Sequence, residues 1–147
     1  MLPRWHILLG IILTALIWIF NPNINIIYPV LLFLSSVLID FDHYAASCSK
    51  SKKIISLKES FKYHEDQKKR MLVEKSRGIR KKADFHIFHT IEFQAIIGLF
   101  GFFWVGFFYI FLGMVFHSLS DLIYLLYKDF FYAREFFLFN WLRKKIF

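Results

Sequence analysis

The sequence predicts an all-α integral membrane protein: a bundle of four transmembrane helices with a basic cytoplasmic helical loop and a C-terminal amphipathic interfacial helix. Of the 147 residues, 57% are hydrophobic and 21% are aromatic. The mean hydropathy of +0.46 is too high for an ordinary soluble domain of this size. In addition, one short segment accounts for the whole net charge of +8. A chain of this length forms one domain, which we place at residues 1–147.

The same composition excludes several other classes of protein. Intrinsic disorder requires low hydrophobicity, which this chain does not have. The single cysteine, Cys48, excludes a disulfide scaffold, a zinc finger and a CxxC redox motif. An integral membrane protein is the class that remains.

The first two membrane spans are predicted from apolar runs in the N-terminal third of the chain. One helix is expected at residues 5–20, because Asn21-Pro22-Asn23 then breaks the apolar run as a turn. A second helix is expected at residues 26–43, where the apolar run ends in Asp40-Phe41-Asp42-His43. Both runs are long enough to cross most of a bilayer core.

The other two spans come from residues 85–127, which are almost continuously apolar. As a single helix this segment would be about twice as long as a bilayer core. We therefore expect two helices, at residues 85–104 and 106–127, joined by a tight hairpin between Gly101 and Gly106.

A basic loop at residues 44–84 separates the two pairs of helices. It contains thirteen of the nineteen Lys and Arg residues but only five of the eleven acids, and so accounts for the net charge. Positive charge in a short loop places that loop on the cytoplasmic side of the membrane. Weak helical periodicity from Leu57 to Leu72 predicts a helix lying near anionic lipid headgroups, the expected partners of this loop. Nucleic-acid binding through the same lysines is the less favoured interpretation.

The tail at residues 128–147 mixes aromatic with basic side chains. This pattern is typical of an amphipathic helix that lies in the membrane interface and does not cross it. Four crossings place both termini in the cytoplasm, as expected of a cell or inner-membrane protein. The pattern indicates no particular oligomeric state.

Histidine and aspartate residues are expected at one common depth in the bundle. His6, Asp40, His89, His117 and Asp121 each lie roughly 17–23 Å along their helices from the outer turns. This level is close to the cytoplasmic interface. Ionisable groups at membrane depth are costly and mark functional sites. All four helices therefore contribute polar groups to one predicted site.

The spacing of these residues is typical of a metal site. His117 and Asp121 are four residues apart and share a helix face, as do Asp40 and His43 at three apart, whereas Asp42 points elsewhere. Histidine and carboxylate ligands without thiolate suit zinc, with manganese or iron as alternatives. Two or three divalent ions are expected. The candidate ligands are His6, Asp40, Asp42, His43, His86, His89, His117 and Asp121.

Further roles are assigned or left open for some of these residues and for two of their neighbours. Asp42 and Glu92 are the candidate catalytic carboxylates, although Glu92, three residues after His89, is alternatively a partner that orients that ring. Whether His86 or His89 is the ligand stays open. His64 lies in the charged loop and is expected to be an ordinary surface residue.

The order of these motifs resembles the YdjM family of membrane-bound metal-dependent hydrolases. The matching residues are His6 in Arg4-Trp5-His6-Ile7-Leu8-Leu9-Gly10, Asp40 and His43 in Leu38-Ile39-Asp40-Phe41-Asp42-His43, His89-Thr90, and His117-Ser118-Leu119-Ser120-Asp121. The chain departs from the family pattern at Ile39, where the family usually has Pro, and in lacking a His-Arg-Gly before the third motif. The family is distantly similar to zinc-dependent phospholipases C and single-strand nucleases, so the resemblance implies phosphoester hydrolysis.

We therefore expect a membrane-bound metal-dependent hydrolase that cleaves a phosphoester of a lipid or lipid-linked substrate at the cytoplasmic interface by metal-activated water. A metal ion lowers the pKa of its bound water to about 7, which provides a nucleophile at neutral pH. The alternative is a metal-binding membrane carrier or scaffold without catalysis. A carrier should hold its ligands midway through the membrane, whereas here they lie near one side. A membrane di-iron oxidase is disfavoured because it would use more histidines.

Overall fold

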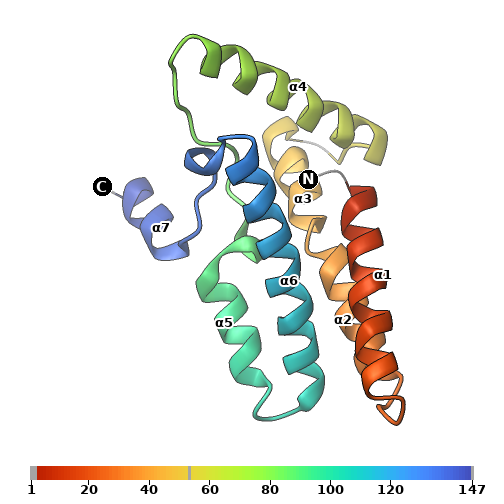
Figure 1. Ribbon diagram of the computed structural model, residues 1–147. Helices are drawn as coiled ribbons and strands as arrows, with labels where there is room; N and C mark the ends of the chain where they lie inside the picture. Colours follow the sequence, from red (N-terminus) through yellow and green to blue (C-terminus); the bar gives the residue numbers. More distant parts are fainter. Residues whose placement is uncertain (1–2, 53, 147) are drawn as a thin grey trace.

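The computed structural model describes residues 3–52 and 54–146, and within these ranges every regular element is helical. Four apolar helices lie alongside one another, and one polar helix lies across one end of them (Figure 1). The all-α prediction is confirmed for this part of the chain. Positions 1–2 and 147 of the expected domain and tail, and position 53 of the expected basic loop, lie outside the described residues.

The helices follow one another with short connections. The α-helices are α1 (Pro3–Phe20), α2 (Ile27–Leu38), α3 (Phe41–Ser51), α4 (Leu57–Ser76), α5 (Ile91–Phe100), α6 (Val105–Tyr127) and α7 (Leu138–Ile146), and the 3-10 turns are η1 (Ile87–His89) and η2 (Phe131–Ala133). The turns after α1 and α5 lie at the end of the bundle opposite α4 (Figure 1). These two turns correspond to the predicted outer turns.

The core is formed where α6 packs against α2 and α5, and α1 packs mainly on α2 and also contacts α6. Glycines allow the closest approaches. A Cβ atom at Gly113 on α6 would overlap the carbonyl oxygen of Leu32 on α2, and one at Gly10 on α1 would lie 2.6 Å from Ser36 Oγ. Small residues at helix contacts are typical of bundles in membranes. They bring the polar ends of α1, α2 and α6 together.

Two of the helical segments are long and apolar enough to cross a membrane, judged by length and composition. These are Ile27–Ser51, which joins α2 to α3, and Val105–Tyr127, which is α6. The apolar helices Arg4–Phe20 and Ile91–Phe100 are shorter. With 10 residues, α5 is about 15 Å long, half of a bilayer core. The predicted set of four full spans is therefore not confirmed, although the helix predicted at residues 106–127 is found one residue longer.

The second predicted helix, at residues 26–43, is bent at its polar end. The chain turns at Ile39 and Asp40 and continues as α3 to Ser51, eight residues into the expected basic loop. The turn stays helical because His43 N–H donates to the Asp40 carbonyl at 3.0 Å and Asp42 N–H to the Ile39 carbonyl. Asp40 is thereby placed at the junction of two helices.

The third predicted helix, at residues 85–104, is wrong over its first six and its last four residues, because α5 spans only Ile91–Phe100. Residues 80–86 are irregular, η1 follows, and α5 begins only at Ile91. The physical reason is that polar groups here bind partners from distant parts of the chain. For example, Ala83 N–H donates to the Ala133 carbonyl at 2.8 Å, and Asp42 accepts from Phe88 N–H at 3.1 Å. A hydropathy pattern does not reveal hydrogen bonds to distant parts of the chain.

The basic loop contains the predicted helix, and the tail is only partly helical. Helix α4 begins with a capping box between Ser56 and Glu59, which satisfies backbone N–H groups at its start. In the tail, α7 covers only the last nine described residues, and residues 128–137 form a segment that packs back onto the chain before α5. We call residues 128–137 the docked tail segment.

Candidate metal centre

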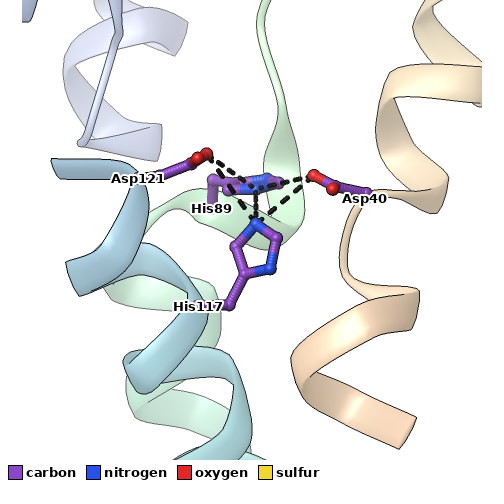
Figure 2. Close-up of side chains that lie close together, drawn as sticks. All are labelled: Asp40, His89, His117 and Asp121. Atoms are coloured by element: carbon purple, nitrogen blue, oxygen red, sulfur yellow. Dashed lines mark hydrogen bonds and ion pairs between the residues drawn. The ribbon is translucent and has the colours of Figure 1, made fainter. Parts of the chain in front are cut away.

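Four side chains from three separate parts of the chain meet toward the α4 end of the bundle. They form the first ligand group, which is Asp40, His89, His117 and Asp121, and their ligand atoms all lie within 4.8 Å of one another. Figure 2 shows the four side chains pointing toward a common centre. Asp40 Oδ1 lies 3.3 Å from His117 Nε2, and Asp121 Oδ2 lies 3.7 Å from the same nitrogen. The group could hold a metal ion.

The two imidazole rings of this group face each other through their Nε2 atoms, which are 3.3 Å apart. His117 Nδ1 lies 2.7 Å from the Ser36 carbonyl oxygen, and His89 Nδ1 lies 3.0 Å from Asp42 Oδ2. Carbonyl and carboxylate oxygens only accept hydrogen bonds, so both Nδ1 atoms donate. In their neutral forms the two rings direct lone pairs at each other, and these lone pairs repel unless a cation lies between them. This arrangement fits a metal ion held by oriented histidines.

A second ligand group lies beside the first. It consists of Asp42, His43 and His86, whose ligand atoms also lie within 4.8 Å of one another. Asp42 Oδ1 and His86 Nδ1 face each other at 3.6 Å, and both atoms are buried without a hydrogen bond among the described residues. Buried polar atoms normally find partners. A cation between them would satisfy both.

Asp42 and Asp40 connect the two groups. Asp42 presents Oδ1 to the second group, while its Oδ2 accepts hydrogen bonds from His89 Nδ1 and Phe88 N–H. Asp40 Oδ1, in the first group, also lies 3.4 Å from His43 Nε2 of the second. The predicted alternatives His86 and His89 thus fall one in each group. The groups form one continuous polar site.

His6 brings helix α1 to the edge of this site. Its ring stacks on His117 with centroids 3.8 Å apart, and its Nε2 lies 3.2 Å from Asp121 Oδ1. His6 is 3% exposed. It therefore contacts Asp121 Oδ1, whereas His89 and His117 lie near Oδ2, and His6 lies adjacent to the first ligand group.

Local hydrogen bonds hold the turn that carries His89. Thr90 Oγ1 donates to the Ile87 carbonyl at 2.7 Å, and Gln94 Nε2 donates to the Phe88 carbonyl at 3.1 Å and to Ser118 Oγ. Thr90 is fully buried. These bonds fix the irregular backbone before α5 against α6, and therefore fix the position of His89.

His86 lies before α5, outside the candidate membrane spans. Burial, together with smaller effects of neighbouring His89 and Arg134, lowers the pKa of His86 from 6.5 to about 4, against the opposing effect of Asp42. The ring is therefore neutral at neutral pH. A neutral imidazole is the form that binds metal ions.

Arg134 is a residue of this site that the sequence analysis missed. It comes from the docked tail segment, and its Nη2 lies 2.8 Å from Asp121 Oδ2. Its side chain is 14% exposed. The sequence did contain one indication of this role. Arg134 is the single arginine in the aromatic stretch from Phe130 to Phe137, in a tail that was expected to lie in the membrane interface.

The structure corrects the prediction for Glu92. Its two carboxylate oxygens accept hydrogen bonds from the backbone N–H groups of Leu138 and Phe139, at 2.9 and 3.3 Å. The carboxylate thus binds the start of α7, where unpaired N–H groups favour a negative charge. It does not orient His89, because Asp42 has that role.

His64 is also placed differently from the prediction of an ordinary surface residue. It is half-buried, and its Nε2 lies 2.9 Å from the His43 carbonyl oxygen. The ring of His64 lies edge-on to that of His43. His64 therefore packs α4 against α3 beside the second ligand group, and it belongs to neither group.

Comparison of the chain with protein-family models, with curated proteins and with solved structures gave no match. The resemblance to the YdjM family therefore rests on the order of the motifs alone. The functional argument below starts from the geometry of the two ligand groups.

Proposed function

We propose that this protein is a membrane-bound metal-dependent hydrolase that cleaves a phosphoester of a lipid or lipid-linked substrate. The observation that carries the proposal is the pair of adjacent ligand groups, connected through Asp40 and Asp42. Many sites that hold two neighbouring ions act on phosphoesters, because one ion activates the attacking group and the other stabilises the leaving oxygen. The motif order shared with the YdjM family supports the same reaction class.

The donor set favours two zinc ions, with manganese or iron as alternatives, because it contains imidazole and carboxylate but no thiolate. When bound, such ions supply an activated water molecule and neutralise negative charge on a phosphoryl group. The first ion would be held by Asp40, His89, His117 and Asp121, and the second by Asp42, His43 and His86.

The protein itself supplies orientation and proton control. The Ser36 carbonyl and Asp42 Oδ2 each hold a proton on the Nδ1 atom of a ring, so that Nε2 of His117 and of His89 is available as a ligand atom. Asp42 is the better candidate of the two predicted catalytic carboxylates, because Glu92 binds α7.

The position of the site favours an amphiphilic substrate. Large apolar side chains cover the opposite end of the bundle, where Phe20, Phe102 and Phe103 are 84%, 88% and 86% exposed. The junction of α2 with α3, which carries Asp40, and the turn before α5, which carries His89, lie at the other end, where the basic helix α4 crosses the bundle (Figure 1). We infer that four helices sit in the bilayer, that α4 faces anionic headgroups in the cytoplasm, and that a lipid headgroup reaches the ligands at the interface.

The test is turnover by purified protein in detergent micelles. Protein loaded with zinc or manganese is incubated with lipid phosphates, lipid diphosphates and phosphodiesters, and phosphate or alcohol release is measured. We expect release that stops when a chelator removes the metal and that falls by at least about a hundredfold in Asp40→Asn. The His64→Ala variant is the matched control and should keep most activity. Metal-loaded protein that hydrolyses none of these lipids would instead indicate a metal carrier or scaffold.

A further inference from the structure

Arg134 is fixed at the edge of the metal centre by contacts on both sides of it. Its own carbonyl accepts a hydrogen bond from Lys82 Nζ at 2.9 Å. The preceding carbonyl, of Ala133, accepts from Ala83 N–H, and that of Phe136 accepts from Ile91 N–H at 3.0 Å. The docked tail segment is thus tied to the stretch of chain that carries His86 and His89. The backbone of Arg134 is therefore held beside the stretch that carries those histidines.

The Arg134 side chain has more hydrogen-bond donors than its ion pair with Asp121 uses. A guanidinium group has five N–H donors arranged for planar, forked binding of carboxylate or phosphate. Nη2 is the atom that lies 2.8 Å from Asp121 Oδ2. At 14% exposure the side chain is mostly desolvated, but not fully enclosed. Arginine is the usual residue for recognising phosphate in such positions.

The charge of the metal centre indicates what anion it would accept. The two ligand groups contain three carboxylates and four histidines, and the histidines are neutral as ligands. With two divalent ions the groups would have one net positive charge, and Arg134 raises this to two. A terminal phosphate group at neutral pH carries up to two negative charges, whereas a phosphodiester carries one. The terminal phosphate matches the site in charge.

We propose that Arg134 binds an anionic oxygen of the substrate and selects a terminal phosphate group, as in a lipid phosphate monoester, over a phosphodiester. This inference rests on the proposed function, because it assumes a metal-loaded phosphate site. In the hydrolysis of such a monoester, water attacks phosphorus, the bond between phosphorus and the lipid oxygen breaks, and the lipid alcohol leaves with a proton. Arg134 forms no covalent bond in this step. It positions the phosphate and offsets its charge.

The test measures binding without turnover. Zinc-loaded wild type, Arg134→Gln and Arg134→Lys are titrated with inorganic phosphate and with dimethyl phosphate by calorimetry, and their zinc content is measured in parallel. We expect wild type to bind phosphate more tightly than dimethyl phosphate. We expect Arg134→Gln to weaken phosphate binding roughly 10- to 100-fold, and Arg134→Lys to weaken it less. Arg143→Gln, an exposed arginine of the same tail, is the matched control and should bind like wild type.

Two results would overturn the inference. One is wild-type phosphate affinity in Arg134→Gln at unchanged zinc content, and the other is equal affinity of the wild type for phosphate and dimethyl phosphate. Arg134 contacts Asp121, so Arg134→Gln could lose zinc. In that case Arg134→Lys is the variant compared with wild type. A phosphate affinity of Arg134→Lys equal to that of wild type then overturns the assignment. Failure of the proposed function looks different: phosphate still binds through Arg134, but no lipid phosphate is hydrolysed.

Discussion

His117 on α6 donates a hydrogen bond of 2.7 Å from Nδ1 to the backbone carbonyl oxygen of Ser36 on α2. The bond couples the orientation of a candidate metal ligand to the distance between two helices. That distance is short because Gly113, four residues before His117, faces the α2 backbone at Leu32. The packing of apolar helix segments thus determines where a polar nitrogen points.

The first prediction follows from this contact. In Gly113→Ala the added Cβ would overlap the Leu32 carbonyl and Ser35 Oγ, so α2 and α6 must separate. We expect a loss of about 1–3 kcal/mol in unfolding free energy and weaker zinc binding. Thermal unfolding in detergent and zinc content measure these effects. Leu119→Ala, at a half-exposed position of the same helix, is the control, and equal effects in both variants would argue against the coupling.

The second prediction concerns the first ligand group. His117→Ala and Asp121→Ala should each reduce bound zinc strongly, because each removes an atom from the set that lies within 4.8 Å. Without a metal ion the remaining carboxylates repel each other, so the variants should also unfold more easily. His64→Ala removes a neighbouring ring outside both groups and should keep its zinc. The measurement is the zinc content of the three purified variants. Full zinc content in both His117→Ala and Asp121→Ala would contradict the assignment of the first ligand group as a zinc site.

The third prediction separates Glu92 from the metal centre. Glu92→Ala should release α7, because it removes the carboxylate that binds Leu138 and Phe139 N–H, yet zinc content should stay near that of wild type. Amide hydrogen exchange at residues 138–146 reports the release. We expect Glu92→Gln, which keeps one acceptor oxygen, to release α7 less. A loss of zinc in Glu92→Gln would indicate that Glu92 does contribute to the metal centre.

The fourth prediction is a pH dependence of stability in the zinc-free protein. Burial lowers the pKa of His86 to about 4 from 6.5, so the unfolded chain takes up a proton at higher pH than the folded one. Its contribution to stability is therefore complete above pH 6.5 and is lost progressively as the pH falls toward 4. The total is a few kcal/mol by order of magnitude. The unfolding free energy, measured with denaturant at several pH values in this range, should depend less steeply on pH in His86→Asn than in the wild type. The same dependence on pH in both proteins would mean that a group other than His86 causes it.

The fifth prediction is the topology. With Cys48 replaced, single cysteines at Asn23 in the turn after α1 and at Lys69 on α4 should react with an impermeant thiol reagent from opposite sides of the membrane. The reason is that the apolar helices separate these two positions (Figure 1). Labelling from the same side would contradict the proposed location of the site at the cytoplasmic interface.

Composition and apolar periodicity were sufficient to predict the helical class and the position of α6. Both depend on local properties, because every buried backbone group in an apolar segment is satisfied within its own helix. The hairpin at Gly101 to Gly106 and the helix of the basic loop were also predictable from local features, namely the length of the apolar segment with its glycines and the helical periodicity from Leu57 to Leu72. The spacing of His117 and Asp121 on one helix face likewise follows from helix geometry.

The pairing of side chains was decided by the tertiary structure alone. Asp42 was expected to point away from the ligands, but the bend at Ile39 and Asp40 turns it toward His86 and His89. Glu92 was expected beside His89, but the late start of α5 turns it to α7. Arg134 reaches Asp121 only because the tail docks on the chain before α5. Sequence spacing predicts which residues share a helix face, whereas contacts between distant segments depend on how those helices bend and pack.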